Sequence, residues 1–306
     1  MSPVGASTIG SAWFLNGVAN LQQQEVQTQK ETSSGYQIQD AADSPAQTPE
    51  LITLGSNLAA VQAYQTNLGS IQTETAAADQ GLGSAISLIQ SAISTGEQGA
   101  NTSSTATTDQ NLAAQIQSVQ QQIVSVANTT VDGRYIFGGD LDQSTPFSYS
   151  AAAGITSLTN PTSTRVVVDT QGQAVYQSLS AQQIFNPTDA TGAPTAANTV
   201  AALQSLETAL TANDQAGVAS ALTSLQAASA YVNQQQAYYG TAENRIASEQ
   251  NKSASQVTAL TTSIGAIRDT NIAQAATELS QENADQSAAY GAQAEISTKS
   301  LFDYLG

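Results

Sequence analysis

Residues 51–68, with the sequence LITLGSNLAAVQAYQTNL, place apolar side chains three and four positions apart. This heptad spacing is typical of a helix that buries one narrow stripe against a partner helix. The stripe comprises Leu51, Leu54, Leu58, Val61, Gln65 and Leu68, and it continues through Thr75, Ala78, Leu82, Ala85, Ile89 and Ala92. The spacing predicts one helix from about residue 50 to 94, roughly 65 Å long.

The segments beside this helix carry start and stop signals. Thr48-Pro49-Glu50 predicts the helix start, because a capping residue there precedes a proline in the first turn. The stretch from Ser94 to Thr108 is rich in Gly, Ser and Thr and predicts a turn. A second helix is predicted from about residue 109 to 130, on a stripe made of Leu112, Ile116, Val119, Ile123 and Val126.

The middle of the chain loses the helical spacing. Residues 131–140 place aromatic residues between glycines, which favours a strand and a turn. Four prolines fall between residues 141 and 195, and residues 164–169 and 174–179 are short strand candidates on either side of Gln171-Gly172. We therefore predict a small β-containing insert of about 60 residues.

Helical spacing returns in the last third. Residues 200–210 predict a short helix and residues 218–267 a long one. The end segments 11–31 and 269–304 have weak, alanine-rich stripes, which alone bury too little apolar surface to offset the chain entropy. We expect these end helices to become ordered against neighbouring subunits.

The predicted fold is therefore mainly α. It is a long antiparallel helical or coiled-coil bundle built from both chain ends, with a small β-containing insert in the middle. The predicted divisions, in chain order, are an N-terminal assembly helix and loop (1–45), the first half of a helical shaft (46–140), the small β-rich insert (141–196), the second half of the shaft (197–268) and a C-terminal assembly helix (269–306).

Composition excludes several classes of function. The 306 residues include 7 Lys and Arg against 24 Asp and Glu, for a formal net charge of −17. Binding to nucleic acid or to an anionic membrane needs clustered cations, and the sequence has none. The absence of His and Cys removes the Ser-His-Asp and Cys-His triads and the usual zinc sites. We expect no cofactor.

Two motifs near the chain ends resemble the bacterial flagellin superfamily. Residues 33–38, SSGYQI, followed by Ala41-Ala42-Asp43, are similar to the loop after the first flagellin helix, although that loop usually has Arg at the position of Gln37 and a second Asp at that of Ser44. Residues 272–279, IAQAATEL, and residues 301–305, LFDYL, resemble the ending of this family.

The middle of the chain resembles the hook–filament junction branch of the family more than flagellin itself. The resemblance lies in residues 127–139, ANTTVDGRYIFGG, in residues 145–147, in residues 183–185, and in the helix pair at residues 200–245.

This resemblance implies a structural, non-enzymatic subunit that is exported by the flagellar type III apparatus without a cleaved signal. It implies an extracellular ring or helical tube of identical subunits. The implied partners are the hook-side junction protein, flagellin, and an export chaperone on the C-terminal helices.

From the weak end stripes we expect one set of side chains to become buried on assembly: Phe14, Val18, Leu21, Ile272, Leu279, Leu301, Phe302 and Leu305. Three alternatives remain. The first is flagellin, the bulk filament subunit. The second is an adhesin or autolytic enzyme on a flagellar scaffold, for which residues 141–195 are too few. The third is a needle or translocator protein, which would need an amphipathic membrane segment that the sequence lacks.

Possible ligand residues have simpler interpretations. Asp140 and Asp142 lie beside Gly138 and Gly139, but calcium needs six or more oxygen ligands, so a turn is favoured. Glu278 and Glu282 lie four apart on one helix face, which favours a solvated surface over an acid–base pair. We expect no catalytic or metal site.

Overall fold

A computed structural model describes residues 4–101, 105–169 and 172–298. The chain divides into two compact units. Unit 1 contains residues 1–60 and 256–306, and unit 2 contains residues 61–255. Two long helices run through both units, because each unit takes one end of each helix.

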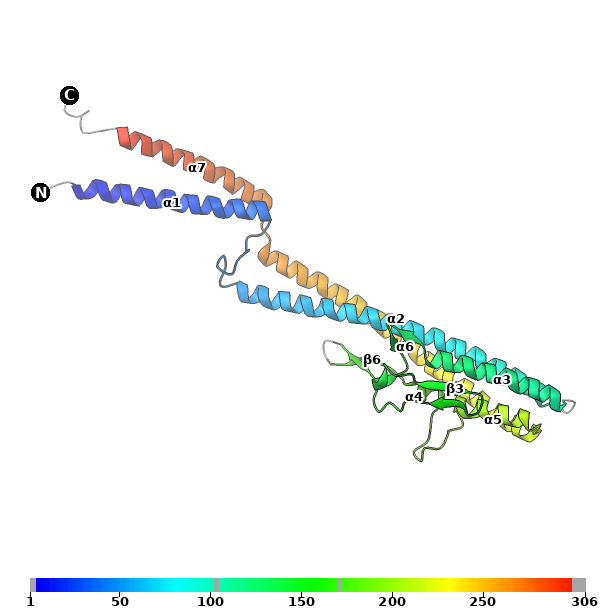
Figure 1. The fold of residues 1–306 in the computed structure, drawn as a ribbon. Helices are drawn as coiled ribbons and strands as arrows, with labels where there is room; N and C mark the ends of the chain where they lie inside the picture. Colours follow the sequence, from blue (N-terminus) through cyan, green and yellow to red (C-terminus); the bar gives the residue numbers. More distant parts are fainter. Residues whose placement is uncertain (1–3, 102–104, 170–171, 299–306) are drawn as a thin grey trace, which may run out of the picture. The chain divides into compact units, whose positions relative to one another are not determined.

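Helices dominate the described chain (Figure 1). The α-helices are α1 (Val4–Ser34), α2 (Thr48–Gly99), α3 (Ala106–Ala127), α4 (Ala181–Phe185), α5 (Thr199–Thr211), α6 (Gln215–Arg268) and α7 (Ile272–Thr298). The strands form antiparallel pairs, β1 (Thr130–Val131) with β2 (Arg134–Tyr135), β3 (Phe147–Ser150) with β4 (Gly154–Ser157), and β5 (Val166–Val168) with β6 (Ala174–Gln177).

Helices from the two ends of the chain pair in opposite directions. In unit 2, Gln250 on α6 donates to Gln72 on α2 at 2.9 Å, and further along α2 the Gln90 amide donates to Ser229 at 2.9 Å. Residue numbers rise along α2 while those of their partners fall along α6, so the two helices are antiparallel. The predicted fold class, an antiparallel helical bundle with a small β-containing insert, is confirmed.

The predicted turn from Ser94 is wrong in its first part, because α2 continues to Gly99. The glycines there allow close helix packing. A methyl group at Gly96 would lie 2.8 Å from Leu222 Cδ2, and one at Gly99 would overlap Leu210. Helix α3 then starts earlier than predicted, after Thr105, whose hydroxyl accepts the Thr108 N–H at 3.3 Å.

Thr48 does not cap α2 in the predicted way. Its hydroxyl donates to the Ser44 carbonyl at 2.8 Å and does not accept a helix N–H. The local chain already turns at residues 44–48, since the amides of Gln47 and Thr48 both donate to that same carbonyl. The start signal therefore gave the correct position through a different hydrogen bond.

The insert contains the predicted strands and more. The pair β5–β6 lies where the sequence predicted two strands, whereas the β3–β4 hairpin was missed. The turn between β1 and β2 places Asp132 and Gly133 at positive φ, 51° and 75°. An Asp-Gly pair tolerates this conformation and favours a tight hairpin.

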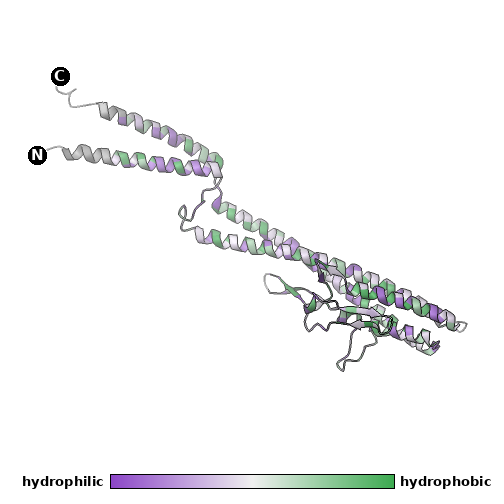
Figure 2. Ribbon diagram, viewed as in Figure 1, coloured by the Kyte–Doolittle hydropathy of each residue, from purple (hydrophilic) through white to green (hydrophobic). Residues whose placement is uncertain are grey.

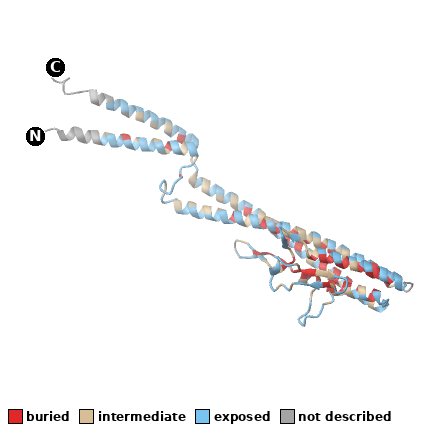
Figure 3. Ribbon diagram, in the orientation of Figure 1, coloured by how far each residue is buried: buried red, intermediate tan, exposed pale blue. Residues whose placement is uncertain are grey.

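Unit 2 holds the main core. Figure 3 shows buried residues concentrated where α2, α3, α5 and α6 meet the strands. Phe137 stands edge-on between the rings of Phe185 and Tyr239, at 6.3 Å from each ring centre. Leu82 and Ile89 on α2 are fully buried in the same cluster.

Candidate assembly surfaces

The terminal helices α1 and α7 of unit 1 lie side by side, also antiparallel (Figure 1). Gln22 donates to the Tyr290 hydroxyl at 2.7 Å, and Gln286 donates to Glu25 at 2.7 Å. On α1 the less exposed residues follow heptad spacing, at Phe14, Val18, Leu21, Glu25, Thr28 and Thr32. On α7 the matching stripe is Ala275, Leu279, Glu282, Gln286 and Ala289.

The middle of this α1–α7 stripe is polar. Thr28 is only 8% exposed, and its hydroxyl donates to Glu282 Oε1 at 3.1 Å. The other oxygen, Glu282 Oε2, is buried and has no hydrogen-bond partner. A polar layer of this kind fixes the register of two helices but weakens their association. The helix pair is therefore less stable than an apolar pair of equal length.

The residues predicted to bury on assembly fall into three groups. Phe14, Val18, Leu21 and Leu279 lie on the α1–α7 stripe, so the chain itself already covers part of their surface. Ile272, at the start of α7, is 55% exposed. Leu301, Phe302 and Leu305 lie outside the described residues. Burial of all eight on assembly stays a prediction.

Sequence reasoning missed other exposed apolar residues on α1. Trp13 is 81% exposed, and Leu15 and Val26 are each more than half exposed. Leu15 and Val26 belong to a second stripe with Ala19 and Gln22, again spaced four and three apart. This spacing was visible in the sequence, but two large residues in four positions are a weak signal.

The loop between α1 and α2 is fastened to the end of α6. The amide of Gln37 donates to the Arg268 carbonyl at 2.8 Å, and Thr270 N–H donates to the Gly35 carbonyl at 2.9 Å. The Arg268 guanidinium stacks 4.0 Å from the centre of the Tyr36 ring and pairs with Asp269 at 2.9 Å. The family-like SSGYQI segment thus links the two chain ends inside unit 1.

The start of α2 is less covered than the rest of this helix. Leu51, Leu54 and Leu58 are half-buried, and Ile52 is 67% exposed. The facing end of α6, at Leu260, is also half-buried. This part of the helix pair has apolar surface that the described residues leave accessible.

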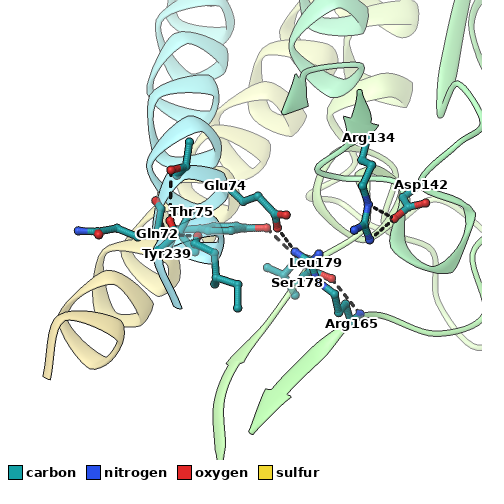
Figure 4. Close-up of polar contacts among 12 residues, drawn as sticks. Gln72, Glu74, Thr75, Arg134, Asp142, Arg165, Ser178, Leu179 and Tyr239 are labelled. Atoms are coloured by element: carbon teal, nitrogen blue, oxygen red, sulfur yellow. Dashed lines mark hydrogen bonds and ion pairs between the residues drawn. The ribbon is translucent and has the colours of Figure 1, made fainter. Parts of the chain in front are cut away.

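The insert is held on the helices by polar contacts from several elements (Figure 4). Arg165 forms an ion pair with Glu74 on α2, and its amide donates to Ser178 Oγ at 3.0 Å. The hydroxyl of Tyr239 on α6 accepts the Leu179 N–H at 3.3 Å. Burial raises the pKa of Tyr239 to about 12, so this hydroxyl stays neutral.

The helix α6 also satisfies the free edge of β6. The Tyr238 hydroxyl donates to the Gln177 carbonyl at 2.7 Å and accepts the Gln177 N–H at 3.2 Å, and Arg245 donates to the Ala174 carbonyl. A strand edge closed by side chains cannot extend into another sheet. The insert is thereby fixed in one position on unit 2.

The candidate calcium residues have structural partners. Asp140 accepts from the Thr162 hydroxyl at 2.9 Å and from the Thr162 N–H at 3.1 Å, and these bonds lower its pKa. Asp142 pairs with Arg134 (Figure 4). Within the described residues, no group of His, Cys, Asp and Glu could hold a metal ion.

The hydropathy of the residues also fits polar surfaces with thin apolar stripes (Figure 2). None of the described helices has the length and apolarity to cross a bilayer.

Comparison with known proteins bears on both chain ends and on the fold. The N-terminal helical region of bacterial flagellin matches residues 9–141, and the C-terminal helical region of bacterial flagellin matches residues 222–305. No curated protein sequence matches the chain.

Solved structures share the fold at low sequence identity. A putative flagellar hook-associated protein from Vibrio parahaemolyticus is 19% identical, with a TM-score of 0.63 over 74% of this chain and 99% of that one. FlgL from Bacillus cereus is 18% identical, with a TM-score of 0.47 over 67% of this chain and 99% of that one. The Vibrio structure supports the fold assignment, whereas the Bacillus structure is too distant to support it further. Since the two flagellin regions together match most of the sequence, the chain belongs to the bacterial flagellin family of structural flagellar proteins.

Proposed function

We propose that this chain is a structural subunit of the bacterial flagellum that joins the hook to the filament. The observation that carries the proposal is the α1–α7 pair, which combines family-specific ends with exposed apolar side chains and a weak polar layer. A helix pair of this kind gains further stability when neighbouring subunits cover it. The description of the similar Vibrio protein as hook-associated is in keeping with the junction role.

The proposal includes a location and partners. The chain is exported through the flagellar type III apparatus, with a chaperone on its C-terminal helices, and assembles outside the cell as a ring or helical tube. Its neighbours are the hook-side junction protein and flagellin. The role is structural and not enzymatic, in keeping with a sequence that has neither His nor Cys.

The proposed assembly residues are those of the two terminal helices. On this view the α1–α7 stripe orders the helix pair, and the exposed positions Leu15, Val26 and Ile272 then contact neighbouring subunits. The predicted burial of Leu301, Phe302 and Leu305 belongs to the same proposal. Unit 2 holds its own core and does not depend on this step.

Removing residues 270–306 tests the role of the ends. We expect a soluble chain with a folded unit 2 that no longer assembles, because α1 loses α7, the helix with which it pairs in unit 1. Circular dichroism measures the folding, and electron microscopy measures the assembly. Normal assembly of the truncated chain would contradict the proposal.

A deletion strain separates the junction role from that of flagellin. Loss of the filament, with a complete hook and with flagellin shed into the medium, supports the junction role. If purified chain instead grows long tubes from filament seeds, it is the bulk filament subunit. Hooks that carry normal filaments in the deletion strain would exclude both roles.

A further inference from the structure

Unit 1 has an apolar groove of about 490 Å³ at the start of α2. Its apolar lining comes from the loop, from α2 and from the end of α6: Ile38, Leu51, Ile52, Gly55, Leu58 and Ile264. Leu58 and Ile264 are only half-buried, and Ile52 is largely exposed. The groove is therefore an apolar site that no described residue of the chain fills.

The polar residues that line this groove make it acidic. Asp40 and Asp269 contribute carboxylates, and Arg268 is the lining cation. That arginine is already engaged, stacked on Tyr36 and paired with Asp269. An occupant with carboxylates would be repelled. An apolar group with a hydrogen-bond donor would suit both the lining and the carboxylates.

Trp13 on α1 matches this chemistry. It is the single tryptophan of the chain, and at 81% it has the largest exposed fraction among the large apolar side chains of the described residues. Its indole has a broad apolar body and one N–H donor. No Asp, Glu, Lys or Arg occurs before Glu25, so this half of α1 carries no side-chain charge to meet the carboxylates. By contrast, α7 carries Glu278, Glu282 and Asp285.

Trp13 cannot enter the groove of its own chain. Helix α1 continues from Trp13 to Ser34, which separates Trp13 from the loop by roughly 30 Å of helix. The groove begins with Ile38, directly after that loop starts. A projecting side chain and a cavity that lie on different parts of one chain can meet only between copies. Such head-to-tail contacts produce rings or helical tubes and not closed dimers.

We propose that the groove at Ile38, Gly55 and Ile264 receives Trp13 of a second copy of this chain, with the indole N–H directed to Asp40 or Asp269. This contact rests on the proposed function, because it supplies the subunit-to-subunit contact of the ring or tube. It adds which two surfaces meet, and that they meet head to tail.

Cysteine cross-linking tests the contact, because the chain contains no cysteine of its own. One full-length chain carries Asn16→Cys, one turn from Trp13 on an exposed face, and the other carries Thr261→Cys, which lines the groove. The control partner carries Ser263→Cys, an exposed position on the same helix outside the groove. Mixed at high concentration and oxidised, the first pair should give a heterodimer at least about tenfold more abundant than the control pair.

Two further substitutions keep the test independent of folding. Gly55→Leu fills the groove, and Gly69→Leu is its matched control, since a Cβ atom added at either helix position meets no atom within 4 Å. Only the first should abolish the cross-link. Trp13→Ala should abolish it too, whereas Gln23→Ala, at an exposed position further along α1, should not. In the unsubstituted chain the Trp13 emission should shift to the blue on self-association, and Gly55→Leu should remove that shift.

The outcomes distinguish this inference from the proposed function. Equal yields with Thr261→Cys and Ser263→Cys, or a yield unchanged by Gly55→Leu, would overturn the contact. So would cross-linking of Thr261→Cys in isolated flagella only to a different protein. A deletion strain with normal filaments would instead refute the flagellar role and leave a positive cross-link intact.

Discussion

The same two helices, α2 and α6, bury their apolar side chains fully in unit 2 and leave them partly exposed in unit 1. In unit 2, Leu82 on α2 and Leu225 on α6 are fully buried, because α3, α5 and the insert add a third layer. In unit 1, Leu58 and Ile264 lie on the same apolar stripes of α2 and α6 but stay half-buried. The apolar spacing is alike in the two places. The difference shows that full burial comes from the third layer and not from the spacing.

Truncating one leucine in each region gives the largest expected difference. Leu82→Ala should lower the free energy of unfolding by about 2 to 5 kcal/mol, because it leaves a cavity in a fully buried site. Leu58→Ala should cost less than about 1.5 kcal/mol, because its surroundings are open to solvent. Urea unfolding followed by near-ultraviolet circular dichroism measures both. Equal losses would mean that unit 1 is covered as completely as unit 2.

Adding one methyl group to a glycine should change the free energy of unfolding in opposite directions in the two regions. Gly96→Ala should destabilise unit 2 by about 1 to 2 kcal/mol, since the new methyl group would lie 2.8 Å from Leu222 and 3.1 Å from Leu206. Gly55→Ala should stabilise α2 by about 0.5 to 1 kcal/mol, because its position is open and alanine favours helix. Thermal unfolding of the two variants provides the measurement, and a stabilising Gly96→Ala would refute the close packing.

The polar layer of the α1–α7 stripe can be replaced by an apolar one like that of unit 2. The double variant Thr28→Leu with Glu282→Leu should stabilise the helix pair by about 1 kcal/mol, because it removes a buried carboxylate oxygen that has no partner. Amide hydrogen exchange in α1 reports this change. Glu278→Leu, an exposed α7 position, is the control, and similar protection in both variants would argue against a role for the polar layer.

Lowering the pH should destabilise one loop in each unit, to a similar and small extent. Hydrogen bonds from the Thr162 side chain hold the pKa of Asp140 below 3.8 in unit 2, and those from the backbone N–H groups of Asp40 and Gln39 do so for Asp43 in unit 1. A lowered pKa means that the stabilisation is complete above pH 3.8 and is lost as the pH falls further. Asp140→Asn and Asp43→Asn should each flatten the acid dependence of amide exchange in their own loop only. An effect in the other unit would contradict this separation.

Much of the fold could be predicted from heptad spacing. The stripes at residues 51–92, 112–126 and 218–267 gave three helices and the antiparallel arrangement, because apolar periodicity is a local property of the chain. The β3–β4 hairpin was missed because Phe147 and Ile155 are its only buried residues, too few for an alternating pattern. The continuation of α2 through Gly96 was missed because glycine predicts a turn unless a neighbour packs against it.

The candidate surfaces were less predictable. The stripe through Phe14, Val18 and Leu21 was recognised, but the sequence could not show that α7 covers it. Trp13 carries no periodic partner, so only its exposure on the folded helix distinguishes it.

The sequence by itself determined where helices form, that the chain is acidic and lacks the residues of common active sites, and which family its ends belong to. These are properties of residue order and composition. The tertiary structure alone decided which apolar stripes are covered and which stay open, because burial depends on elements distant in sequence. It also decided that the groove beside Gly55 and the exposed Trp13 lie in places where only separate copies can bring them together.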